Sequence, residues 1–197
     1  TVWCWGNGAL SGGGSNVAAT TPQLVAGGHS FAALARVANA TRCAVDVSGA
    51  VHCWGFSVDG RLADGVNGLT PSLVSGAINF ASISGGRNHH CGLTGGGTAY
   101  CWGLNGSGQV GNGTVSPGQG SFNAPTTVVG GVTFARLERS TGQVTCGITA
   151  DSTGYCWGLT HWGDTTGTPT IIPGGHKWIA IAASLSHACG IVADSTA

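Results

Sequence analysis

The triplet Cys-Trp-Gly occurs four times along this chain of 197 residues, and no other feature limits its fold so strongly. The copies begin at Cys4, Cys53, Cys101 and Cys156, so that their spacings are 49, 48 and 55 residues. Self-similarity at such a period is the signature of solenoids and propellers. We therefore interpret residues 1–197 as a single repeat domain. Its units run approximately over 4–52, 53–100, 101–155 and 156–197, with residues 1–3 as a complementing strand.

Each unit repeats the same order of short apolar segments and turns. In the second unit, Pro71, Leu73 and Val74 form an apolar run, Gly76 follows in a turn, and residues 80–83 (Phe-Ala-Ser-Ile) come next. Short alternating segments bounded by Gly and Pro are typical of strands, and no segment keeps a helical period. One such sheet cannot cover its own apolar face, so neighbouring units must stack. The sequence predicts an all-β, β-propeller-like array of four repeats, or blades.

Six of the eight cysteines form three pairs in which the partners are ten residues apart. Turn-like residues lie between the partners, so each pair can face across a hairpin at a distance that suits a disulfide. The predicted bonds are Cys43–Cys53, Cys91–Cys101 and Cys146–Cys156. The alternative, metal binding by paired thiolates, is disfavoured because zinc ligands usually lie two to four residues apart. Such bonds indicate an oxidising compartment, and we expect an extracellular or cell-surface location.

The remaining cysteines, Cys4 and Cys189, lie in segments that match the second and first halves of the same hairpin. A disulfide between them is therefore predicted as well. Three arrangements are open: the ends meet within one chain and close a ring, they meet between chains as a head-to-tail polymer, or the chain is part of a longer array. The residues predicted to mediate assembly are Thr1, Val2, Trp3 and Cys4 on one side and Gly190, Ile191 and Val192 on the other.

The repeat resembles the regulator of chromosome condensation repeat in its bacterial, cysteine-containing form. The match is strongest over residues 101–114, where Cys-Trp-Gly is followed by a turn rich in Asn and Gly, and a His-x-Cys element stands at 89–91 and 187–189. The resemblance implies a β-propeller, usually of seven blades. The family includes a nucleotide exchange factor, domains linked to ubiquitin ligases and secreted inhibitors of β-lactamase.

Charge and residue types argue against several functions. Lys plus Arg number 7 and Asp plus Glu number 7, so the chain lacks the positive surface that nucleic acids require. No apolar stretch is long enough for a membrane helix. Glu138 is the only glutamate. His89 and His90 are adjacent on a predicted strand and point to opposite faces, so they cannot share a metal. Asp59 and Asp64 are too few for a calcium site. We predict no enzyme activity, cofactor or metal.

Two hypotheses for function follow. In the first, the protein is an extracellular structural scaffold whose complementary terminal half-hairpins join copies into a filament or surface layer. In the second, it is a monomeric secreted propeller that binds a protein or glycan partner. The tryptophans of the four triplets are expected in the core, whereas Trp3 and Trp162 do not recur and are candidates for exposed contacts. A hydrolase is a third option that the few carboxylates disfavour.

Overall fold

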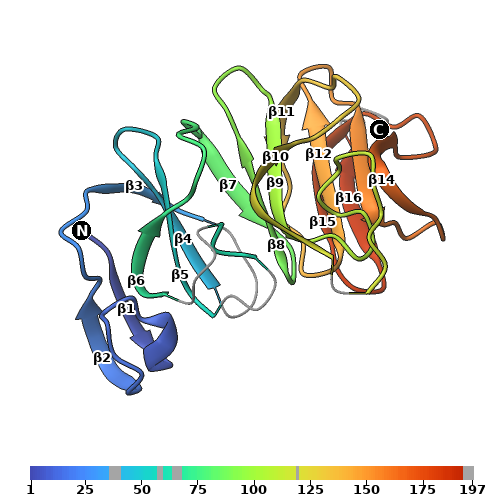
Figure 1. Ribbon diagram of the computed structural model, residues 1–197. Coiled ribbons are helices and arrows are strands. Elements are labelled where there is room, and N and C mark those ends of the chain that lie inside the picture. The colour runs from blue at the N-terminus through green and yellow to red at the C-terminus, as the bar shows by residue number, and fades with distance from the viewer. Residues whose placement is uncertain (36–40, 57–59, 64–67, 119, 193–197) are drawn as a thin grey trace.

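The structure is a computed structural model, and it describes all residues except 36–40, 57–59, 64–67, 119 and 193–197. Its strands form three complete four-stranded sheets and two two-stranded sheets, arranged in a row from the N-terminus to the C-terminus (Figure 1). The prediction of an all-β, propeller-like array of blades is confirmed. Among the described residues the single helix is a 3-10 turn, η1, over Gly8–Leu10, and no helix there could cross a membrane.

The sheets follow one another along the chain, and strands adjacent in sequence pair antiparallel within each sheet. The first half-blade consists of β1 (Trp3–Gly6) and β2 (Ala19–Leu24). The first complete blade consists of β3 (Phe31–Leu34), β4 (Thr41–Asp46), β5 (Val51–Gly55) and β6 (Gly68–Leu73). The second consists of β7 (Ser82–Gly85), β8 (His89–Leu93), β9 (Ala99–Leu104) and β10 (Ser121–Thr127). The third consists of β11 (Phe134–Leu137), β12 (Val144–Thr149), β13 (Gly154–Leu159) and β14 (Thr165–Ile171). The last half-blade consists of β15 (Trp178–Ala183) and β16 (Ala188–Val192).

The sheets are offset by half a blade from the sequence repeats. Each inner Cys-Trp-Gly triplet lies in the third strand of a sheet, so a unit that starts at the triplet contributes two strands to one sheet and two to the next. The division at 53, 101 and 156 therefore marks the sequence repeat, whereas the folded blade begins about half a repeat earlier. This offset is why the chain has half a blade at each end.

A disulfide joins the two central strands of every complete blade. The bonds are Cys43–Cys53, Cys91–Cys101 and Cys146–Cys156, with Cα–Cα distances of 4.1 Å. In each hairpin the two cysteines are direct partners in the strand register, and the short distance is that of a pair without its own backbone hydrogen bonds. The three disulfides predicted from the ten-residue spacing are confirmed.

A tryptophan links each complete blade to the sheet before it. Trp54, Trp102 and Trp157 are fully buried, and the indole Nε1–H of each donates to a backbone carbonyl in the turn of the preceding sheet. The acceptors are Leu10 at 3.1 Å, Arg61 at 2.9 Å and Gln109 at 3.0 Å. Trp102 also packs in one cluster with the Cys43–Cys53 disulfide, and Trp157 packs with Cys91–Cys101. The expectation that the triplet tryptophans lie in the core is confirmed for these three and is wrong for Trp5, which has no sheet packed against it among the described residues.

The fourth triplet tryptophan, Trp5, provides a test of this packing. It has the same repeat position as Trp102, but its side chain is 64% exposed. We expect Trp102→Ala to lower the free energy of unfolding by about 3–5 kcal/mol, because it opens a large cavity between blades. Trp5→Ala should change it by less than about 1 kcal/mol. Urea unfolding of monomeric samples, followed by circular dichroism, measures both, and equal losses in the two variants would contradict this account.

Candidate functional site

The two half-blades leave strand edges open at opposite ends of the array. In the described part of the chain, β1 pairs with β2 alone and β16 pairs with β15 alone, and the two lie far apart (Figure 1). Cys4 and Cys189 are free thiols, the first half-buried and the second exposed. The disulfide predicted between them is therefore not formed within this chain, because three complete blades separate the two strands. An open edge presents unpaired backbone groups to another strand.

Residues of the half-blades are exposed although their counterparts in complete blades are buried. Ile191 follows Cys189 by two residues, as Leu93 follows Cys91, but Ile191 is 62% exposed and Leu93 only 5%. Every residue of β8 is buried, whereas none of β16 is. The same repeat pattern thus meets solvent at the ends of the array. Exposed apolar side chains next to an open strand edge are typical of an interaction surface.

Three ring side chains form a constant group in each complete blade. In the second blade, Phe80 lies edge-on to Tyr100, with centroids 6.0 Å apart, and tilted against Trp102, also at 6.0 Å. The third blade repeats this with Phe134, Tyr155 and Trp157, and the first with Phe31, His52 and Trp54.

In the half-blades the same three positions are divided between the two ends of the chain. Trp178 begins β15, whereas Trp3 and Trp5 lie on β1. Trp3 is 54% exposed. The structure corrects the interpretation that Trp3 does not recur, because it occupies the position of Tyr100. The sequence signal was a ring residue before every triplet cysteine: Trp3, His52, Tyr100 and Tyr155.

A cavity of about 240 Å³ opens between the third blade and the last half-blade. Its wall is mainly apolar and includes Cys156, Trp162, Ile172 and Trp178. Between the second and third blades, the corresponding positions form one cluster with Trp157. Trp162 is therefore half-buried in a cavity wall, and its interpretation as a non-recurring contact residue was incomplete.

Backbone hydrogen bonds establish which positions correspond. The amide of Val128 donates to Ala99 and that of Ile172 to Gly154, so these residues are equivalent. The amides of Gly111 and Gly163 each donate to the carbonyl three residues earlier, so these two glycines are also equivalent. The residues that immediately precede them, Val110 and Trp162, are therefore counterparts. Trp157 packs against Cys101, Val110, Val128 and Phe134. The counterparts of these residues line the cavity: Cys156, Trp162, Ile172 and Trp178. We call the cavity the socket, because it matches the site of Trp157 but contains no indole.

Buried histidines form polar contacts between the complete blades. Nε2 of His90 lies 2.8 Å from Oγ1 of Thr41 in the first blade, and Nε2 of His89 lies 2.8 Å from Oγ1 of Thr145 in the third. The Thr145 hydroxyl donates to the Gln109 carbonyl, so it accepts from His89. The two rings point to opposite neighbours, as predicted from their adjacency. Among the described residues no group of three metal-binding side chains occurs, and Asp59 and Asp64 lie outside them.

Burial lowers the pKa of His89 to about 4. It also lowers the pKa of His90 to about 3, with smaller effects from the charges of His89 and Arg61. Both histidines are therefore neutral at pH 7 and serve packing. His187, the counterpart of His89, is exposed, and its Nδ1 lies 3.1 Å from Ser184 Oγ, because no further blade follows β16 among the described residues.

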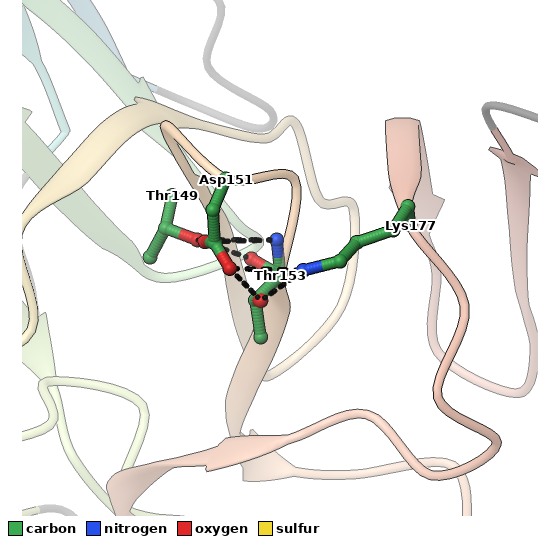
Figure 2. Close-up of polar contacts among 4 residues, drawn as sticks. All are labelled: Thr149, Asp151, Thr153 and Lys177. Carbon is green, nitrogen blue, oxygen red and sulfur yellow. Dashed lines mark hydrogen bonds and ion pairs between the residues drawn. The ribbon is translucent and has the colours of Figure 1, made fainter.

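The acidic residues of the hairpin turns accept hydrogen bonds within their turns and, at Asp151, from the next half-blade. Asp151 accepts hydrogen bonds from the hydroxyls of Thr149 and Thr153 and from Lys177 Nζ at 2.9 Å (Figure 2). These bonds hold the pKa of Asp151 below its usual range. Lys177 immediately precedes β15, so this exposed contact ties the third blade to the last half-blade. In the first blade, hydrogen bonds from Ser48 lower the pKa of Asp46 to about 2.

Comparison with known proteins places these features in a family context. Residues 80–109 match the model of the regulator of chromosome condensation (RCC1) repeat. A search of curated protein sequences finds no match. The matched segment contains the end of one sequence unit and the start of the next, including β8, β9 and the Cys91–Cys101 disulfide. The match therefore centres on the most regular blade of the array.

Solved structures share the fold over nearly the whole chain. Prp20p from Saccharomyces cerevisiae has a TM-score of 0.80 at 18% identity, covering 98% of this chain and 52% of that one. Human WBSCR16 has a TM-score of 0.79 at 18% identity, covering 96% and 52%. Yeast RCC1 (Prp20) bound to Kap60 has a TM-score of 0.79 at 19% identity, covering 98% and 50%. This chain spans about half the length of these proteins, and the similarity shows the fold.

The buried histidines predict how stability depends on pH. Their folded pKa values lie below the value of 6.5 of an unburied histidine, so the unfolded chain binds more protons between pH 6.5 and about 4. Stability should therefore fall as the pH is lowered through this window, and His89→Gln should reduce the slope by about one proton. Urea midpoints at several pH values measure the slope. A midpoint that stays constant from pH 7 to 4.5 would contradict the assignment.

Proposed function

The chain is an RCC1-repeat protein with a β-propeller fold, and from this premise we propose that it is a non-enzymatic extracellular scaffold that assembles head-to-tail. The first half-blade of one copy completes the last half-blade of another. One observation carries the proposal: repeat positions that are buried in three complete blades are exposed in both half-blades, as Leu93 and Ile191 illustrate. Completing the blade buries this apolar surface, which is favourable by about 25 cal/mol per Å².

The register of the proposed junction follows from the complete blades. In the second blade, His90 pairs with Trp102, Cys91 with Cys101, Gly92 with Tyr100 and Leu93 with Ala99. The same register between β16 and β1 of two copies sets Cys189 opposite Cys4, Gly190 opposite Trp3, and Ile191 opposite Val2. A strand added to an open edge gains main-chain hydrogen bonds, and its side chains give specificity. In an oxidising compartment, an external oxidant takes two electrons and two protons from the facing thiols, which then form the fourth hairpin disulfide.

The geometry of the array decides whether head-to-tail contacts close. Heterologous contacts give a ring when the rotation between copies closes, and a filament when it does not. The chain supplies three complete blades and two halves, and it spans about half of the propeller proteins that share its fold. Two copies joined in this way contain eight blades, one more than the usual seven of the family, and a ring of two copies is the smallest closed assembly. A filament or surface layer is the outcome if the ring remains open.

The three disulfides support a location outside the reducing cytosol. Structural disulfides form and persist in oxidising environments such as the cell exterior. The low content of charged residues, 7%, agrees with a chain whose surface takes part in an assembly. We therefore place the scaffold outside the cell or on its surface.

A second function, binding of another protein by a single copy, is favoured by the proteins that share the fold. The solved structures include Prp20p, described with its binding to Gsp1p and histones, and yeast RCC1 (Prp20) bound to Kap60. Under this alternative the half-blades contact a protein or glycan partner in place of a second copy. It predicts a monomer with unlinked ends in isolated protein.

Cysteine variants separate the two functions. Oxidised wild-type protein should run as linked multimers on non-reducing gels and as a monomer after reduction. Cys4→Ser keeps only Cys189 and Cys189→Ser keeps only Cys4, so each alone should stay largely monomeric because its complementary thiol is missing. A mixture of the two should give a disulfide-linked dimer and nothing larger.

The controls make this result specific. If Cys4→Ser alone forms linked dimers as readily as the mixture does, the bond reflects random oxidation of an exposed thiol. If wild-type protein is monomeric on gels and by light scattering under both conditions, head-to-tail assembly is wrong and the binding function remains.

A further inference from the structure

We propose that the cavity between the third blade and the last half-blade is a specific binding site for the Trp5 indole of a second copy. The inference rests on the proposed head-to-tail function and names the side chain that anchors it. The carbonyl of His161 is the acceptor for the indole N–H. The bound group is thus a tryptophan side chain from a Cys-Trp-Gly strand.

The cavity has the same kinds of lining residue as the site that holds Trp157. Around Trp157 the wall is formed by a disulfide, an apolar turn residue, a residue just after the fourth strand and an aromatic residue of the indole's own blade. The cavity presents the same kinds of group at the corresponding positions. They are Cys156, Trp162, Ile172 and Trp178. Only the indole from β1 of a completed fourth blade is missing from this set.

The hydrogen-bond acceptor is also in place. Each bound indole donates to a carbonyl two residues before a residue with positive φ, as Gln109 precedes Gly111 (φ 75°) and Arg61 precedes Ala63 (φ 56°). Gly163 has φ 99°, and the residue two positions before it is His161, which lines the cavity.

Trp5 is the side chain in this chain that matches the site. It is the fourth triplet tryptophan and is 64% exposed, whereas the other three are fully buried. Cys4, its neighbour, packs on the opposite side in one cluster with Trp54, so β1 already serves as the base for the first complete blade. The free face of β1 therefore presents the Trp5 side chain, and the last half-blade provides the cavity that binds it.

The Trp5 that fills the cavity belongs to a second copy, because the Trp5 of the same chain cannot reach it. β1 and the cavity lie at opposite ends of the array, with three blades between them (Figure 1). Binding of Trp5 in the cavity also brings Trp3 and Trp5 beside Trp178. This arrangement restores the three-ring group of the complete blades. An apolar cavity of this size with one backbone acceptor suits an amphipathic ring such as indole.

The test measures non-covalent association in a Cys4→Ser/Cys189→Ser background, so that no disulfide contributes. Trp5→Ala should weaken self-association roughly 30-fold or more, as expected for a buried aromatic anchor. Trp5→Phe keeps a ring but loses the N–H and should fall between Trp5→Ala and the background protein. Phe56→Ala, at an aromatic residue that is 47% exposed on a complete blade, is the matched control and should associate like the background protein. Sedimentation equilibrium gives the constants.

A complementation experiment guards against misfolded variants. Ile172→Arg places a charge in the socket but keeps Trp5, whereas Trp5→Ala keeps the socket. Each should be monomeric alone, and the mixture should form a one-to-one dimer through the single intact junction. Absence of that dimer, or association of Trp5→Ala as strong as that of Phe56→Ala, overturns the inference and leaves head-to-tail assembly standing. Absence of association in the background and wild-type proteins overturns both.

Discussion

The structure depends on one contact: the tryptophan of each complete blade packs on a cysteine of the preceding sheet, which is disulfide-bonded at Trp102 and Trp157 and is the free thiol of Cys4 at Trp54. Trp102 covers Cys43–Cys53 and Trp157 covers Cys91–Cys101, and each indole is fixed by a hydrogen bond to a backbone carbonyl of the preceding turn. Backbone hydrogen bonds between sheets add to this contact, since the amides of Phe80 and Phe134 donate to carbonyls of the preceding blade. The disulfide provides a rigid apolar platform, and the N–H bond sets the orientation of the ring. Because each contact joins two sheets, the exposed Trp5 and the cavity of the last half-blade are the two halves of one such contact.

The polar contacts between neighbouring blades differ from one junction to the next. His90 bonds to Thr41 across one junction and His89 to Thr145 across the following one, in both cases with a buried neutral ring. At the junction to the last half-blade, the exposed pair of Asp151 and Lys177 contributes, and exposed ion pairs add little stability. Apolar packing of Ile181 and Ala183 against the third blade completes this junction.

Much of the fold could be predicted from the sequence, because covalent and conformational constraints repeat in phase. The ten-residue spacing predicted three disulfides, and the Gly and Pro punctuation predicted short strands. The site was only partly predictable. The turn after the triplet differs in length between units, so the match between Trp162 and Val110 appears only when backbone hydrogen bonds align them. Trp3 was missed because Tyr and His occupy its position elsewhere. The separation of Cys4 from Cys189 depends on the offset of sheets from repeats, which sequence spacing does not reveal.

The central claim is that β16 and β1 of different copies form one covalently closed hairpin. Its most direct test is mass spectrometry of protein reoxidised from an equal mixture of unlabelled and fully ¹⁵N-labelled chains. The account predicts a linked peptide pair containing Cys4 and Cys189, half of it with one labelled and one unlabelled member. A Cys4–Cys189 pair of uniform isotope composition would show a bond within one chain. That result, or either thiol bonded to one of the six internal sulfurs, would contradict the account.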